Sequence, residues 1–135
     1  MRPAQQRVLH AAAKTVLHQK LNILKTVTQQ HYTHSLTPLF NASVGGHIRH
    51  SLDHYAALLS HDYTAGTHAH ASDSVVPVID YDVRDRQTDI ETNKASAVVR
   101  TNELLQRLDD LFSTTCAEDL LATPLSVRFV GESLS

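Results

Sequence analysis

An uninterrupted apolar periodicity near the N-terminus restricts this chain to a fold that contains a long helix. No Pro or Gly occurs between residues 4 and 30. Within this range apolar side chains recur at steps of three and four residues, the spacing of one face of an amphipathic α-helix. They are Val8, Leu9, Ala12, Ala13, Val16, Leu17, Ile23, Leu24 and Val27. The pattern predicts one helix over residues 4–30.

Two later stretches show the same helical periodicity. Ser43 is a good N-cap for a second helix over residues 44–60, although two glycines weaken its first turn. Thr92 can cap a third helix over residues 93–115. The apolar positions of this third helix are Val98, Leu104, Leu105, Leu108, Leu111 and Phe112.

The segments between and after these helices are predicted to be connections or short strands. Residues 31–42 should connect the first two helices, and the polar, His-rich residues 61–74 should form a mobile surface loop. The β-branched stretch near 75–81 contains Pro77, which favours an extended edge segment. Alternating apolar residues predict a short strand near 125–130.

Three amphipathic helices in 135 residues predict an all-α fold, a helical bundle that forms a single domain over residues 1–135. A four-helix bundle without its last helix would expose an apolar face. We therefore expect either a homodimer formed through an exposed apolar groove or a chain that is incomplete at its C-terminus.

Composition excludes several classes of partner and site. Lys and Arg total 12 against 14 Asp and Glu, so the formal charge of −2 does not favour binding to nucleic acid or to an anionic membrane. No stretch approaches the roughly 20 apolar residues of a membrane span. Cys116 is the only cysteine, which excludes an intrachain disulfide and a Cys-rich zinc site. These features predict a cytoplasmic protein.

Three histidines of the second predicted helix are candidate metal ligands. Residues three or four apart share a helix face, so His47 with His50 and His50 with His54 are both geometrically acceptable pairs. At 1.5 Å per residue His47 and His54 are about 10.5 Å apart along the axis, too far for one ion to use all three. Asp53 could orient a ligand imidazole. The alternative is that these histidines are solvated side chains beside the core.

A second dense group of polar residues precedes the third predicted helix. It comprises Asp80 to Arg86, followed by Glu91. Its acids and arginines could form a self-neutralising loop of salt bridges, each worth little when exposed. Alternatively, Arg84 and Arg86 could clamp a carboxylate or phosphate through bidentate bonds. The sequence leaves both interpretations open.

In this order, the two groups resemble a subgroup of the DinB-like family of metal-binding four-helix bundles. The similar segments are SVGGHIRHSLDHY at residues 43–55 and YDVRDR at 81–86 with IET at 90–92. The approach to the second helix, with YT at 32–33 and PLF at 38–40, is similar as well. The resemblance covers about residues 7–131. It implies an up-down-down-up bundle whose fourth helix is missing from this chain.

The resemblance also implies a divalent-metal site and a type of chemistry. The family ligand that follows the opening serine of the second helix by seven residues falls on His50, with His54 and His47 as further candidates. The other family ligands form an HxxxH pair on the last helix. Because the resemblance implies that this helix is missing, the chain should hold Zn, Ni or Fe only weakly.

Relatives of this type include thiol transferases and hydrolases that act on small-molecule substrates. The residues that would orient the metal ligands or line the substrate pocket are Asp53, Tyr81, Asp82, Arg84, Arg86 and Glu91. No catalytic residue is assigned. The alternative is a non-catalytic helical binding or scaffold protein that pairs with another chain.

Overall fold

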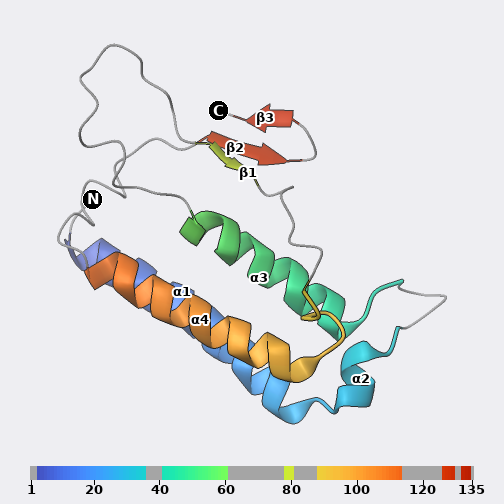
Figure 1. The fold of residues 1–135 in the computed structure, drawn as a ribbon. Coiled ribbons are helices and arrows are strands. Elements are labelled where there is room, and N and C mark those ends of the chain that lie inside the picture. The colour runs from blue at the N-terminus through green and yellow to red at the C-terminus, as the bar shows by residue number, and fades with distance from the viewer. Residues whose placement is uncertain are drawn as a thin grey trace.

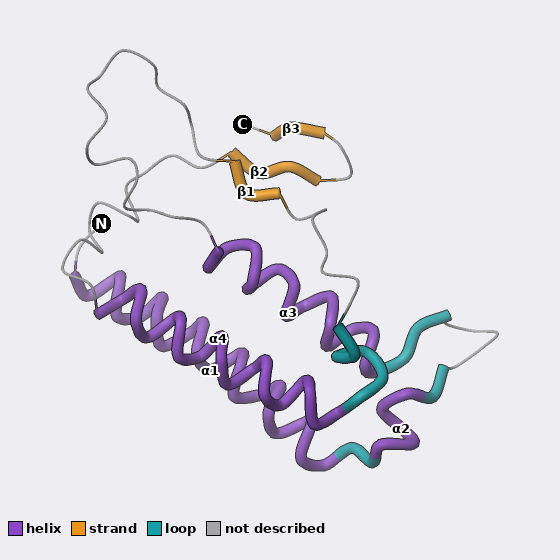
Figure 2. The backbone as a smooth tube through the Cα atoms, in the orientation of Figure 1, coloured by secondary structure: helices purple, strands orange, loops and turns teal. Residues whose placement is uncertain are grey.

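The computed structural model describes residues 3–35, 41–60, 78–80, 88–113, 126–129 and 132–134 (Figures 1 and 2). Its helices are α1 (Pro3–Thr26), α2 (Gln29–Thr33), α3 (Val44–Ser60) and α4 (Lys94–Ser113). These helices contain most of the described residues, so the prediction of a mainly helical fold is confirmed. None of the described helices is both long enough and apolar enough to cross a membrane.

The three long helices pack with α4 in contact with both α1 and α3. Figure 1 shows that α1 runs in the opposite direction to α3 and α4, which run parallel to each other. The short helix α2 contacts α3. A parallel pair of helices needs a long return connection, and residues 61–93 provide it between α3 and α4.

The core lies where these helices meet. Leucines from α1 and α4 and two aliphatic residues from α3 form its centre, and Tyr32 and Ile90 close one end. The residues of the buried cluster are Leu17, Leu21, Leu24, Tyr32, Ile48, Leu52, Ile90, Ala97, Leu104, Leu105 and Leu108. Thr101 is also fully buried, but its hydroxyl donates to the Ala97 carbonyl at 2.7 Å, which removes the cost of an unpaired polar group.

The apolar residues of α1 do not form the single buried stripe that the periodicity predicted. Val8, Leu9, Val16 and Ile23 are exposed by 69%, 45%, 40% and 47%. Leu9, Val16 and Ile23 are spaced by seven residues, so they form a second stripe beside the buried one. The prediction was wrong on this point because the packing of α3 and α4 covers only one side of α1.

The predicted helix over residues 4–30 is divided into two. The helix α1 ends at Thr26, and Thr28 adopts an extended conformation with φ −73° and ψ 158°. The Thr28 hydroxyl accepts a hydrogen bond from the His31 N–H at 3.1 Å, which caps α2 within the predicted connection. Thr28, which directly follows the last apolar residue of the pattern, therefore acts as a cap that the periodicity did not reveal.

The starts of α3 and α4 are fixed by side-chain caps. The Ser43 hydroxyl accepts from the Gly46 N–H at 3.0 Å, as predicted for α3. Asn93 caps α4, because its Oδ1 accepts from the N–H groups of Ala95 and Ser96. The predicted cap Thr92 is one residue too early.

Three short strands form a small sheet in the order β1 (Val78–Asp80), β2 (Ser126–Phe129) and β3 (Glu132–Leu134). The pairing of β1 with β2 is parallel, and that of β2 with β3 is antiparallel. Both predicted extended segments therefore contain a strand. The strand β3 was not predicted, since its three residues are too few to show alternation. The loop predicted at 61–74 lies outside the described residues.

Candidate functional site

The structure brings His50 and His54 together on the outer surface of α3. Their Nε2 atoms are 3.3 Å apart, and the ring centroids are 4.6 Å apart with an interplanar angle of 79°. The His50 side chain is exposed and that of His54 is half-buried. The third candidate, His47, is exposed in the first turn of α3.

The separation of the two Nε2 atoms suits a shared ion. Nitrogen ligands lie about 2.0–2.1 Å from zinc, so the coordinating nitrogens of two imidazoles on a tetrahedral ion are about 3.3–3.4 Å apart. A hydrogen bond in which one neutral ring donates to the other also fits this distance. Within the described ranges, no group of three or more His, Cys, Asp or Glu residues could hold a metal ion.

Asp53 and Glu91 both pair with Arg49. Arg49 Nη1 lies 3.3 Å from Asp53 Oδ2, and Arg49 Nε lies 2.8 Å from Glu91 Oε2. Asp53 is four residues after Arg49 on α3, whereas Glu91 lies in the turn before α4. The Glu91 carboxylate thus holds the turn to α3, whereas the Asp53 carboxylate pairs with Arg49 within the helix, and the sequence analysis assigned neither role.

The turn before α4 packs closely against the first turn of α3. A Cβ placed on Gly45 would overlap the Glu91 carbonyl oxygen and lie 2.9 Å from Tyr32 Cε1. The Tyr32 hydroxyl donates a hydrogen bond to the Ile90 carbonyl, so α2 holds the same turn. Gly45 therefore weakens the helix but permits this close approach.

Burial and charge also act on Tyr32 at this junction. Desolvation, with a smaller contribution from the Glu91 carboxylate, raises the pKa of Tyr32 from 10.0 to about 12. Both causes disfavour the tyrosinate form. Tyr32 is therefore a neutral hydrogen-bond donor near pH 7.

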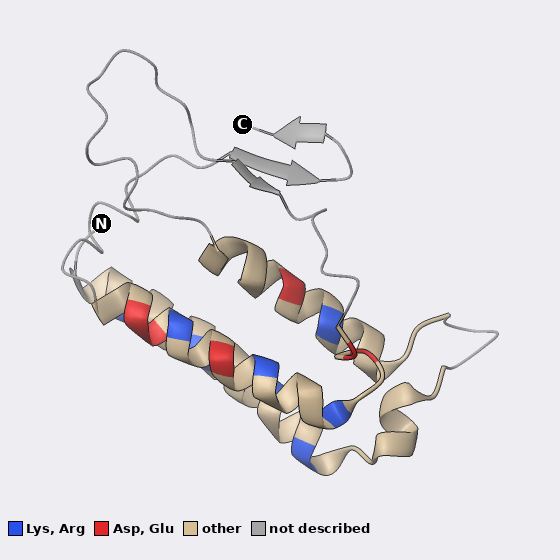
Figure 3. Cartoon of the chain, in the orientation of Figure 1, with Lys and Arg blue, Asp and Glu red and all other residues tan. Residues whose placement is uncertain are grey.

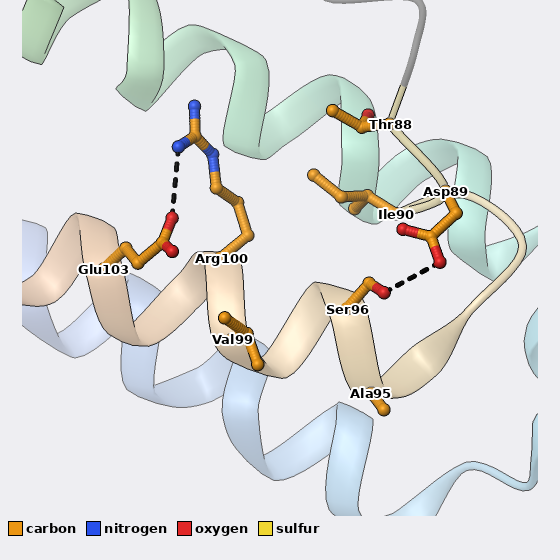
Figure 4. A pocket seen from close by; sticks show the side chains of 8 residues that line it. All are labelled: Thr88, Asp89, Ile90, Ala95, Ser96, Val99, Arg100 and Glu103. Carbon is orange, nitrogen blue, oxygen red and sulfur yellow. Dashed lines mark hydrogen bonds and ion pairs between the residues drawn. The ribbon is translucent and has the colours of Figure 1, made fainter.

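The remaining predicted pocket residues, Tyr81, Asp82, Arg84 and Arg86, lie outside the described residues. A pocket of about 530 Å³ is present where the turn before α4 meets that helix (Figure 4). Its lining residues are Thr88, Asp89, Ile90, Ala95, Ser96, Val99, Arg100 and Glu103.

The charged groups of this pocket bond to their neighbours. Ser96 donates to Asp89 Oδ2 at 2.9 Å, and Arg100 Nη1 donates to Glu103 Oε2 at 3.2 Å. Such local pairs contribute to the wall of the pocket and do not by themselves identify a ligand.

A further polar cluster joins α1 to α4. His10 Nε2 lies 2.8 Å from Asp109 Oδ1, Lys14 Nζ lies 2.8 Å from the same atom, and the His10 ring stacks on Phe112 with a centroid distance of 4.5 Å. The hydrogen bond from Lys14 is the main cause that lowers the pKa of Asp109.

This cluster follows from the distribution of charge along the chain. None of the 14 acidic residues precedes Asp53. Helix α4 carries both acidic and basic residues along its length (Figure 3). The acid-free helix α1 can therefore pair with carboxylates of α4, and the His10 cluster is best explained as a link between helices.

Comparisons with protein-family models, with curated proteins and with solved structures find no match for this chain. The function is therefore proposed from the geometry of the His50 and His54 pair together with the sequence resemblance.

Proposed function

We propose that this chain is a DinB-like helical protein that binds a divalent metal through His50 and His54. The observation that carries the proposal is the 3.3 Å separation of the two Nε2 atoms. Imidazole nitrogens suit zinc, nickel and iron, the metals expected from the sequence. The resemblance selects His50, and the geometry adds His54.

The arrangement of the helices supports the same proposal. Helix α1 runs opposite to α3 and α4, which is the order of the first three helices in an up-down-down-up bundle. Arg49 supports the site indirectly, because its pair with Glu91 holds α3 next to the turn before α4. This pair holds in place the helix backbone that carries the two imidazoles.

A thiol transferase or hydrolase activity is the finer part of the proposal. A bound divalent ion would lower the pKa of a water or thiol and supply a nucleophile near pH 7. The chain's own contribution is to bind through the Nε2 atoms of His50 and His54 and to orient both rings. The resemblance places one of the three family ligands, His50, in this chain, so activity depends on how the remaining positions are filled.

Zinc or nickel titration of the purified chain, followed by calorimetry, tests the metal site. We expect His50→Ala to lose the tightest binding event, while His47→Ala, at another exposed position on the same helix, keeps it. Circular dichroism of both variants checks that the helices remain folded. Unchanged binding by His50→Ala would remove His50 from the site.

A second candidate function is a non-catalytic helical protein that pairs with another chain. The exposed apolar stripe of α1 favours it, since exposed apolar residues that adjoin one another commonly mark an interaction surface. This stripe is where we place the homodimer contact expected from the sequence. Light scattering without metal would then give a dimer that Val16→Lys dissociates, whereas a Val16→Lys variant with unchanged mass would exclude pairing through the stripe.

A further inference from the structure

The His50 and His54 pair occupies one edge of a potential tetrahedral site and leaves the opposite edge to other ligands. Two imidazoles from one helix can supply only two of the four positions that zinc prefers. The Nε2 separation of 3.3 Å already equals the edge length expected at such an ion. A second pair with the same separation would therefore complete the tetrahedron.

In the described part of the chain, the pair lies on a side of α3 where the His50 side chain is exposed and the His54 side chain is half-buried. Tyr55 marks the side of α3 that faces α1, because its hydroxyl donates to the Ala13 carbonyl at 3.2 Å. Arg49 marks the side that faces the turn before α4 through its 2.8 Å contact with Glu91. At 100° per residue, His50 and His54 project between these two directions, on the side of α3 opposite the buried Leu52.

The charges on α3 allow two copies of this helix to approach each other. Its only charged side chains are Arg49 and Asp53, and these form an i, i+4 pair. The Glu91 carboxylate pairs with the same arginine. The net charge of Arg49, Asp53 and Glu91 is therefore negative and does not repel a cation. A two-fold axis brings identical surfaces together, so the two imidazoles of one copy would meet the same two imidazoles of the other.

We propose that two copies of this chain share one zinc ion, held by His50 and His54 of each copy across a two-fold axis. This inference rests on the proposed metal site and adds its ligand set and its partner, a second copy of the chain. Four imidazoles satisfy the nitrogen-rich tetrahedral coordination that zinc accepts. The bridge makes dimerisation dependent on zinc, unlike pairing through the apolar stripe of α1.

The test combines zinc titration with mass measurement on the full chain. We expect zinc to double the mass from 15.0 kDa and a chelator to reverse the change. Because the chain contains ten histidines, the informative quantity is the difference in bound zinc between the wild type and His50→Ala. The bridge predicts a difference of half an ion per chain, and both His50→Ala and His54→Ala should stay monomeric with zinc.

Each other outcome has a separate meaning. A loss of one ion per chain in His50→Ala, from a wild type that stays monomeric with zinc, would overturn the bridge and leave the metal site standing. Zinc binding that is unaffected by His50→Ala would overturn both. The control His47→Ala should dimerise with zinc like the wild type, and its failure to do so would show that the ligand set has been assigned incorrectly.

Discussion

The two sides of helix α3 differ in how they are held. On one side, Arg49 reaches Glu91 in the turn before α4, and Gly45 admits the backbone of that turn against the helix. On the other side, His50 and His54 contact each other on the outer surface. The first side should determine stability and the second should determine metal binding. Substitutions on each side of α3 test this division of roles.

The largest expected effect comes from the close approach at Gly45. Gly45→Ala would place a Cβ against the Glu91 carbonyl and Tyr32, and we expect a loss of about 1–3 kcal/mol in the free energy of unfolding. Gly46→Ala is the matched control, because its Cβ would meet Glu91 Oε1 and Ser43 Oγ at an ordinary 3.5 Å. This control should gain about 0.5–1 kcal/mol from helix propensity.

Denaturant unfolding of the two glycine variants measures this difference. Equal stability of Gly45→Ala and Gly46→Ala would mean that the turn does not press on α3. The proposed division between the two sides of the helix would then lose its structural basis.

Tyr32→Phe should have the next largest effect. Removing the hydroxyl leaves the buried Ile90 carbonyl without this hydrogen bond, at a cost of about 1–2 kcal/mol in the free energy of unfolding. Tyr55→Phe, at a half-buried position on the α1 side of the helix, is the control and should lose less.

The raised pKa of Tyr32 adds a pH dependence with a defined sign. Between pH 10 and pH 12 the unfolded tyrosine loses its proton while the folded one keeps it, so the unfolded state is favoured as the pH rises. The contribution is complete below pH 10 and declines toward pH 12. Urea unfolding as a function of pH should therefore show a smaller alkaline loss for Tyr32→Phe than for the wild type. Identical pH profiles would contradict the burial of this hydroxyl.

The sequence predicts elements well where local signals agree and fails where distant contacts decide. The bounds of α3 were predicted because the Ser43 cap and the apolar periodicity indicate the same start. The end of α1 was missed because no Pro or Gly marks the break before the Thr28 cap, and the exposure of Val16 depends on which helices pack nearby. The spacing of residues along the chain does not indicate which distant helices will pack against a given side chain.

The candidate site shows the same limit. Helical spacing already restricted an ion to two of three histidines, and the structure brings His50 and His54 together. The pairing of Arg49 with Glu91 could not be predicted, since it joins residues from two separate elements. Sequence spacing can therefore identify candidate ligands on one helix, whereas the contact of that helix with the turn before α4 is known only from the structure.

Glu91→Gln should have a smaller effect on stability. The Glu91 side chain is 48% exposed, and such ion pairs contribute about 0.2–1 kcal/mol. Loss of the carboxylate should also lower the pKa of Tyr32, because Glu91 is one cause that raises it. Ultraviolet titration of tyrosinate measures this shift. Glu103→Gln, which removes an equivalent charge from the Arg100 pair on α4, should leave the pKa of Tyr32 unchanged.

The smallest expected effect on stability belongs to the proposed ligands. In metal-free protein, His50→Ala should change the free energy of unfolding by less than about 0.5 kcal/mol, because its side chain is exposed. Zinc should then stabilise the wild type by mass action and leave His50→Ala unaffected. Thermal unfolding with and without zinc measures both quantities. A metal-free loss as large as that of Tyr32→Phe would place the His50 ring among the contacts that hold the fold, and the two sides of α3 would then share one structural role.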